Sequence, residues 1–180
     1  MGPILITDAS VLINLVASGA AGNILSGCGM EFKVCPDVIR EVKVLRDRET
    51  GEEHAIGLEP FFMAGMLERI ELQTDLEFEL LIDYAALLGA GDGEAMCFAL
   101  AESRGHLIAI DDERAIRRAK KRNPNFETLG TLEILILWQE RNGVADERMG
   151  QLLQSIFRFA RFRPAVSHSN YAWWQRCWGG

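Results

Sequence analysis

The stretch that decides the fold is Pro3-Ile4-Leu5-Ile6-Thr7-Asp8-Ala9-Ser10, close to the start of the sequence. Residues 4–7 form a short apolar run typical of a buried strand, and the spacing of apolar residues over 10–17 predicts a helix. Asp8 lies between the two. A carboxylate that directly follows a buried strand is held near the core, where an unpaired charge is costly. We therefore treat Asp8 as a candidate functional residue rather than a solubilising one.

The same alternation of short apolar runs and longer helical segments continues along the chain. Strands are predicted at residues 4–7, 32–35, 67–72, 107–110 and 126–129, and helices at 10–17, 36–46, 77–88, 92–105, 112–122, 131–139 and 147–159. Strands that alternate with helices indicate βαβ units, so we expect an α/β fold of three layers, with a central, mostly parallel sheet flanked by helices. Residues 47–59 are expected to form a loop, and residues 164–180 show no periodicity.

Three further acidic signals accompany Asp8. They are Glu41 in the helix after the second strand, Asp92 and Glu94 at the start of a later helix, and the doublet Asp111-Asp112 after the strand at 107–110. In open parallel sheets, ligands bind at the carboxyl ends of the strands, so Asp8 and Asp111 are expected to meet. Clustered carboxylates need a cation, and a divalent metal is the natural one. The free N–H groups at a helix start predict that Glu94 stays ionised near neutral pH.

The composition limits the class of protein. The chain has 180 residues, of which 48% are hydrophobic, so it can bury one core. Its apolar runs fall far short of the ~20 residues that span a bilayer, and we expect a cytoplasmic protein with no membrane partner. The four cysteines form no CxxC pair and the three histidines show no zinc spacing, so free thiols in a reducing compartment are expected.

The positive charge of the chain is concentrated, although the net charge is −7. Arg114, Arg117, Arg118 and Lys121 belong to one basic block that follows directly on Asp111-Asp112. On its own, such a block is most often a solvated helix face. Beside an acidic centre it indicates phosphate binding, because the basic side chains can hold phosphates while metal ions bridge them to the carboxylates.

Four segments, taken in this order, resemble the PIN domain. They are Asp8-Ala9-Ser10-Val11-Leu12-Ile13, Pro36-Asp37-Val38-Ile39-Arg40-Glu41-Val42, Gly91-Asp92-Gly93-Glu94-Ala95 and Ile110-Asp111-Asp112-Glu113-Arg114-Ala115, and the resemblance covers residues 3–140. PIN proteins are α/β metal-dependent ribonucleases. The resemblance implies that Asp8, Glu41, Glu94 and Asp111 are the catalytic residues and hold Mg²⁺ or Mn²⁺. Ser10, Asp92 and Asp112 would support this site, and Arg114, Arg117, Arg118 and Lys121 would bind the substrate.

The resemblance also implies partners and an organisation of the chain. The substrate would be RNA, and PIN proteins commonly form homodimers. Many bacterial members are VapC-type toxins held in check by an antitoxin protein. Residues 1–145 would form the nuclease domain, and residues 146–180 would form a helical, Arg- and Trp-rich extension packed on it.

Two alternatives stay open. One is a PIN-like module that binds RNA or a protein partner and has little catalytic activity. The other is a different α/β enzyme that gathers aspartates at strand ends. A phosphohydrolase would need a second acidic residue two positions after Asp8, where Ser10 stands. A receiver domain would need a lone aspartate after a middle strand and a late lysine, which this order of residues does not provide.

Overall fold

The computed structural model describes residues 2–89 and 91–179. At its centre is a sheet of five parallel strands in the order β5-β2-β1-β6-β7. The strands are β1 (Ile4–Thr7), β2 (Glu31–Val34), β5 (Leu67–Arg69), β6 (Leu107–Ala109) and β7 (Thr128–Leu129). β1 is the middle strand, because Ile6 pairs with Lys33 of β2 on one side and with Ile108 of β6 on the other.

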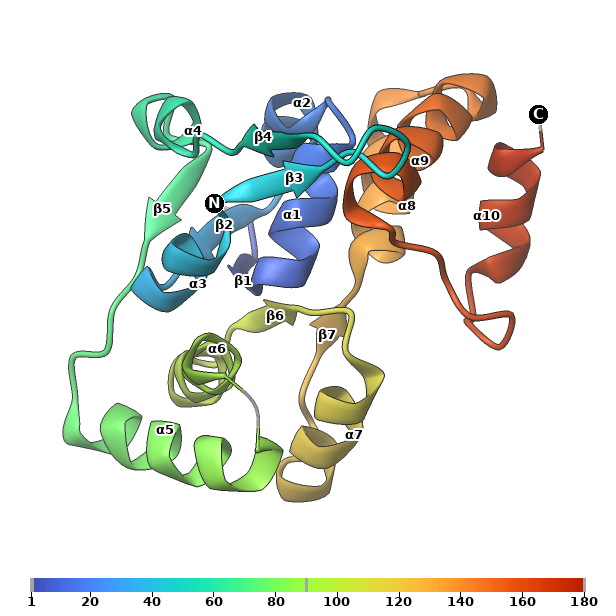
Figure 1. The fold of residues 1–180 in the computed structure, drawn as a ribbon. Coiled ribbons are helices and arrows are strands. Elements are labelled where there is room, and N and C mark those ends of the chain that lie inside the picture. The colour runs from blue at the N-terminus through green and yellow to red at the C-terminus, as the bar shows by residue number, and fades with distance from the viewer. Residues whose placement is uncertain (1, 90, 180) are drawn as a thin grey trace.

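Two groups of helices cover the sheet, one on each side (Figure 1). The first contains α1 (Ala9–Ala17), α2 (Ala21–Gly27), α8 (Thr131–Asn142) and α9 (Asp146–Ala160), and the second contains α3 (Pro36–Glu41), α5 (Asp75–Leu88), α6 (Asp92–Arg104) and α7 (Glu113–Arg122). α4 (Glu59–Met63) precedes β5, and α10 (Tyr171–Trp178) packs on α9. This layering confirms the predicted three-layer α/β fold with a parallel central sheet.

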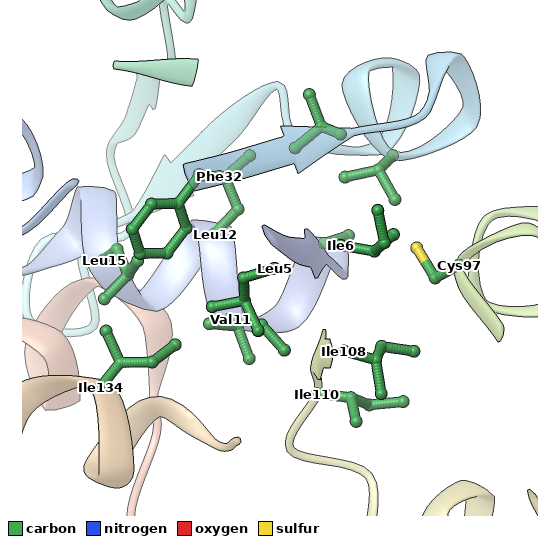
Figure 2. Packing of buried hydrophobic residues seen from close by; sticks show 14 of the residues in the cluster. Leu5, Ile6, Val11, Leu12, Leu15, Phe32, Cys97, Ile108, Ile110 and Ile134 are labelled. Atoms are coloured by element: carbon green, nitrogen blue, oxygen red, sulfur yellow. The ribbon is translucent and has the colours of Figure 1, made fainter. Parts of the chain in front are cut away.

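The middle strand is buried on both faces, because its side chains alternate between the two helical layers. Leu5 and Ile6 are completely buried. Figure 2 shows Leu5 beside Val11 of α1 and Ile6 directed toward Cys97 of α6. Burying an aliphatic side chain of this size contributes about 1.5–3 kcal/mol. The strand therefore anchors the residue that follows it, Asp8, at a fixed point beside the core.

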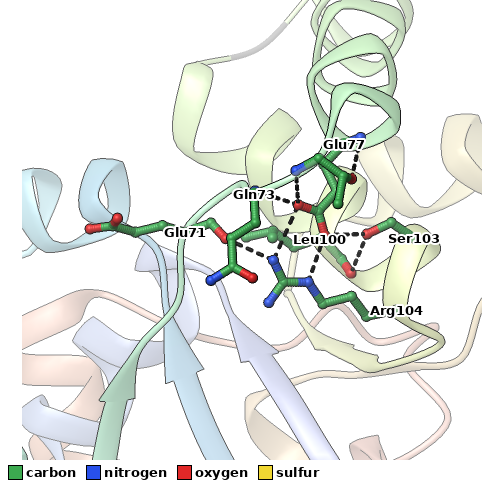
Figure 3. Close-up of polar contacts among 7 residues, drawn as sticks. Glu71, Gln73, Glu77, Leu100, Ser103 and Arg104 are labelled. Carbon is green, nitrogen blue, oxygen red and sulfur yellow. Dashed lines mark hydrogen bonds and ion pairs between the residues drawn. The ribbon is translucent and has the colours of Figure 1, made fainter.

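An ion pair fastens α5 to α6 (Figure 3). Arg104 Nε donates to Glu77 Oε1 at 2.6 Å, and Ser103 Oγ donates to the same oxygen at 3.1 Å. The other carboxylate oxygen accepts the backbone N–H groups of Gln73 and Thr74, and Glu77 is only 2% exposed. The hydrogen bond from Arg104 lowers the pKa of Glu77 to about 2. The network fixes α6, whose first turn reaches the carboxyl end of the sheet.

Several segments differ from the prediction: α4 was not expected, and the strands predicted at 67–72 and 126–129 are shorter as β5 and β7. The helix predicted at residues 36–46 ends at Glu41, and β3 (Val44–Arg46) pairs antiparallel with β4 (Glu53–Ala55), which lies in the predicted loop. These strands are largely exposed, so no apolar pattern marks them. α2 forms in a glycine-containing stretch, and α10 forms in the tail that showed no periodicity. Aromatic stacking stabilises α10, since the rings of Trp174 and Trp178 lie 4.8 Å apart.

The C-terminal helices are bonded to the rest of the chain. Ser155 Oγ of α9 donates to the carbonyl oxygen of Ala17 at 2.7 Å. Arg158 Nη2 of α9 donates to Asp47 Oδ2 at 2.5 Å. Asp47 directly follows β3 and is 3% exposed. α9 therefore connects α1 with the β3–β4 hairpin.

The four cysteines are buried and free, in agreement with the expectation of unpaired thiols. Among the residues that the structure describes, no single helix has the length and apolar character needed to cross a membrane. α1 and α2 would reach that length only together, and the chain bends by 117° between them.

Candidate active site

β1 and β6 place Asp8 and the Asp111-Asp112 doublet at the same end of the sheet. Thr7 pairs with Ala109, and the backbone N–H of Asp8 donates to the carbonyl oxygen of Ala109 at 2.9 Å. Asp8 then caps α1, because its Oδ2 accepts from the Ser10 N–H at 3.1 Å and from Ser10 Oγ at 2.6 Å. Ser10 therefore orients the Asp8 carboxylate.

Glu41 and Glu94 approach these strand ends from the second helical layer. Glu41 is the last residue of α3, and Glu94 lies in the first turn of α6 together with the exposed Asp92. The two helices are so close that a Cβ atom on Gly93 would lie 2.8 Å from Glu41 Oε1. A residue without a side chain at position 93 thus leaves room for the Glu41 carboxylate.

The carboxylates lie close enough to change one another's ionisation. Burial, followed by the charges of Asp8, Asp112 and Glu41, raises the pKa of Glu94 to about 7 from an ordinary value of 4.5. Burial and then the charge of Asp8 also raise the pKa of Glu41, and Asp92 adds a smaller repulsion. With a pKa of about 7, Glu94 is only about half ionised at neutral pH, which is less than its position at a helix start predicts. Burial and three negative neighbours outweigh the helix dipole.

The two residues of the doublet have different surroundings. Asp111 Oδ1 accepts from the Thr131 N–H at 2.7 Å, and its Oδ2 accepts from Thr131 Oγ1 at 2.6 Å and from Asn14 Nδ2 at 3.0 Å. Burial raises the pKa of Asp111, although these hydrogen bonds oppose the shift. Asp112 is exposed and caps α7, where its Oδ1 accepts two backbone N–H groups of the first turn.

A pocket of about 320 Å³ brings part of the basic block to the carboxylates. Its lining includes Glu94, Asp112, Arg114 and Arg118. The two arginines are four residues apart on α7 and so share one face of the helix. Arg118 is also held in place by donating to the carbonyl oxygen of Leu88.

The other two candidate substrate-binding cations lie elsewhere on α7. Arg117 pairs with Glu113, which precedes it by one turn, at 3.2 Å. Lys121 is exposed on the same side of the helix as Arg117, four residues farther along. The structure thus places two of the four predicted cations at the pocket that contains Glu94.

The donor set suits a hard cation, since carboxylate oxygens are the ligands that Mg²⁺ and Mn²⁺ prefer. Within residues 2–89 and 91–179, no three His, Cys, Asp or Glu side chains are arranged to hold a metal as they stand. Glu41 and Glu94 make no hydrogen bond to the described residues, so their side chains are free to close on an ion. Burial and the repulsion of neighbouring carboxylates raise the Glu94 pKa, and a bound cation would relieve the repulsion.

Sequence reasoning missed three residues that shape this site, namely Asn14, Gly93 and Thr131. Asn14 is 5% exposed and interrupts the apolar sequence of α1, and Thr131 is completely buried at the start of α8. A buried polar side chain needs a hydrogen-bond partner, so an asparagine within an apolar helical pattern was a usable signal. Gly93 carried no comparable signal, because its role depends on a helix that packs against it.

Comparison with known proteins gave one family match, to a model described as a PIN domain, over residues 4–168. Neither the curated proteins nor the solved structures gave a match. The matched span covers all five strands of the parallel sheet and each of the carboxylates at its carboxyl end. Because the match extends over most of the sequence and agrees with the fold, this chain belongs to the PIN-domain family.

Proposed function

We propose that this chain is a metal-dependent endoribonuclease whose catalytic centre consists of Asp8, Glu41, Glu94 and the Asp111-Asp112 doublet. The observation that carries the proposal is that β1, α3, α6 and the turn after β6 bring these carboxylates to one end of the sheet, where burial and the charges of Asp8, Asp112 and Glu41 raise the pKa of Glu94. Carboxylates gathered from separate elements against their mutual repulsion are typical of functional sites. PIN domains are generally nucleases, which supports the same conclusion.

Mg²⁺ or Mn²⁺ is the cofactor that this donor set favours. A divalent cation supplies Lewis acidity, which activates water for attack on a phosphodiester and neutralises charge on the leaving oxygen. Asp8, Glu41, Glu94 and one residue of the Asp111-Asp112 doublet would hold it. Ser10 would keep the Asp8 carboxylate aligned through its two hydrogen bonds. Glu94 would have to release its proton before it binds a cation, so cation binding should be weaker below pH 7.

The arginines of the pocket provide the contact with substrate phosphates. A guanidinium group binds a phosphate through two parallel hydrogen bonds. Because Arg114 and Arg118 share the pocket with Glu94 and Asp112, a phosphodiester that they hold would lie against the carboxylates. Arg117 and Lys121 would contact phosphates of the RNA backbone farther along the bound RNA. RNA as the substrate and cleavage at internal positions follow from the family resemblance.

The test is cleavage of a mixed, structured RNA by the purified chain in Mg²⁺, Mn²⁺ or EDTA. Asp8→Asn removes a negative charge from the centre, and Glu79→Gln, on an exposed position of α5, is the matched control. We expect cleavage in either metal, no cleavage in EDTA, loss of cleavage in Asp8→Asn and normal cleavage in Glu79→Gln. Cleavage that survives in EDTA and in Asp8→Asn would refute the proposal. Binding of RNA without cleavage would favour a binding module.

The remaining expectations rest on the resemblance. A homodimer and an antitoxin partner are proposed on that basis alone, and light scattering of the purified chain tests the first. A cytoplasmic location is proposed instead from the short apolar runs of the sequence. We also propose that residues 146–180 act as an extension of a nuclease domain formed by residues 1–145. The bond from Ser155 to Ala17 supports this view, because it attaches α9 to α1.

A further inference from the structure

We infer that the two aspartates of the doublet have different roles: Asp112 joins Glu94 in binding the metal, and Asp111 is a positioning residue locked by Asn14 and Thr131. The inference rests on the proposed function. It is argued from the hydrogen bonds of this chain, and it distinguishes the roles of Asp111 and Asp112, which the sequence alone does not.

The carboxylate of Asp111 is largely used up by protein donors. A carboxylate offers about four lone-pair positions, and three are taken by Thr131 N–H, Thr131 Oγ1 and Asn14 Nδ2. Asn14 Nδ2 also donates to Thr131 Oγ1 at 3.0 Å, so both of its amide hydrogens are engaged. Asn14 is 5% exposed and Thr131 is fully buried. A closed network of this kind is rigid, and breaking one member leaves buried polar groups unpaired.

The network joins parts of the chain that are distant in sequence. Asn14 belongs to α1 and lies 97 residues from Asp111, and Thr131 is the first residue of α8. Gly130 permits the approach, because a Cβ atom there would lie 2.8 Å from Asp111 Oδ1. Its backbone angles are open to any residue, so the close carboxylate explains the glycine. Asp111 thus holds the turn between β6 and α7 against α1 and α8. This contact fixes the direction in which the next residue, Asp112, points.

Asp112 is better suited than Asp111 to bind a metal ion, because one of its carboxylate oxygens is free of hydrogen bonds within the described part of the chain. Only its Oδ1 caps α7, and its Oδ2 has no hydrogen bond to the described residues. Its side chain lines the pocket that also contains Glu94, Arg114 and Arg118. Asp111 lines a different pocket, of about 340 Å³, together with Gly130 and Glu133. Glu94 and Asp112 therefore line the same pocket, and Asp111 lines a different one.

The test compares Asp112→Asn with Asp111→Asn by two measurements on the full chain without RNA. Mn²⁺ affinity is measured by titration of the electron paramagnetic resonance signal of the free ion, and the melting temperature is measured in EDTA. Asp112→Asn should lower the Mn²⁺ affinity by about tenfold or more, because a metal ligand is lost. Its melting temperature should change by less than about 2 °C, as for other exposed substitutions.

Asp111→Asn should give the opposite pattern. An amide at this position turns N–H groups toward the donors of Asn14 and Thr131, so the melting temperature should fall by about 5 °C. Mn²⁺ affinity, measured well below the unfolding transition, should fall by about threefold at most, less than in Asp112→Asn. Thr131→Val should reproduce both effects and add little to Asp111→Asn in the double variant, since the same network is already broken. Thr131→Ser, which keeps the hydroxyl, should restore both the melting temperature and the Mn²⁺ affinity.

The inference is overturned if Asp111→Asn loses more Mn²⁺ affinity than Asp112→Asn, or if it melts at the temperature of the unaltered chain. A complete lack of Mn²⁺ binding by the unaltered chain would overturn the proposed function and the assignment of Asp112 as a ligand. The melting temperatures of the Asp111 and Thr131 variants would still decide the positioning role, so the two failures can be told apart.

Discussion

Replacing Glu94 with glutamine should stabilise the metal-free chain at alkaline pH. The folded-state pKa of Glu94 is about 7, above the ordinary value of 4.5, so between these pH values the folded chain binds more protons than the unfolded chain. Stability therefore falls as the pH rises through this window, and the full penalty is present above pH 7. Glutamine has no charge to bury at any pH. The gain in Glu94→Gln should thus be largest at pH 8 and nearly absent at pH 4.5.

The size of the effect follows from the two pKa values. A change from 4.5 to about 7 corresponds to about 3.5 kcal/mol, since one pKa unit is worth about 1.4 kcal/mol. Glu94 is only partly buried, and solvent screening reduces this to about 1–2 kcal/mol. For a chain of this length, that gain raises the melting temperature by roughly 3–6 °C.

The assay is thermal unfolding in EDTA at pH 4.5, 6 and 8, with Glu79→Gln as the control for loss of an exposed carboxylate. Addition of Mn²⁺ at pH 8 should reverse the order, because the unaltered chain gains stability from the ion and Glu94→Gln gains much less. If the unaltered chain is the more stable of the two in EDTA at pH 8, or if the difference does not depend on pH, then burial and the neighbouring carboxylates do not destabilise the Glu94 charge as described.

Three further predictions concern the support of the site and its substrate contacts. Arg104→Ala leaves the buried Glu77 charge unpaired and should lower the free energy of unfolding by about 3 kcal/mol at pH 7 in urea. That loss should shrink as the pH falls from 4.5 toward 2, because Glu77 has its pKa at about 2 in the folded chain and becomes protonated. Gly93→Ala should displace the Glu41 carboxylate and weaken Mn²⁺ binding several-fold in a calorimetric titration, while the free energy of unfolding changes by less than about 1 kcal/mol. Arg114→Ala should weaken RNA binding and reduce the salt dependence of the affinity by about one phosphate contact, as measured by filter binding in EDTA.

These predictions have matched controls. Gly91→Ala is the control for Gly93→Ala, because a Cβ atom at position 91 would lie 3.8 Å from Glu41 Oε1, an ordinary contact. Equal loss of Mn²⁺ affinity in both variants would contradict the steric argument. Lys120→Ala, elsewhere on α7, is the control for Arg114→Ala, and an equal effect of both would mean that the helix acts through its overall charge. For Arg104→Ala, a loss that is the same at pH 7 and pH 3 would rule out the ion pair as its cause.

Local sequence was sufficient to predict the parallel sheet and the position of each of its strands to within about three residues. The apolar runs at residues 4–7 and 107–110 are each followed by an acidic residue and then a helix, and this order constrains the connection between neighbouring parallel strands. Asp8 and Asp111 could be placed at the carboxyl end for that reason. Glu41 was harder to place, because a glutamate on a short helix is usually part of its polar face. Its assignment came from the order of the four segments as a set.

Contacts between distant segments account for what the sequence did not reveal. The bond from Asn14 to Asp111 spans 97 residues, and no local pattern specifies it. The ionisation of Glu94 depends on its burial and on charges from three other elements, so its helix position alone led us to expect more ionisation than the structure gives. The hairpin of β3 and β4 is largely exposed and therefore lacks the alternation that marks a half-buried strand.

The backbone under the carboxylates is fixed by the core. The thiol of Cys97 donates to the carbonyl oxygen of Thr7 at 3.8 Å, and the thiol of Cys35 donates to that of Gly93 at 3.9 Å. Both cysteines are completely buried. The two carbonyl groups belong to the residues directly before Asp8 and Glu94, so the buried thiols help to set where these side chains start.

The side chains of the four carboxylates differ in how many conformations they can adopt. Hydrogen bonds already orient the side chains of Asp8 and Asp111, whereas Glu41 and Glu94 have none to the described residues. Ordering a free glutamate side chain costs up to about 1.5–2 kcal/mol, and Glu94 must also lose its proton at neutral pH. If the two aspartates also had to be ordered, the entropic cost would be larger. A fold that orients Asp8 directly, and Asp112 through the locked Asp111, therefore leaves mainly the two glutamates to be ordered when a cation binds.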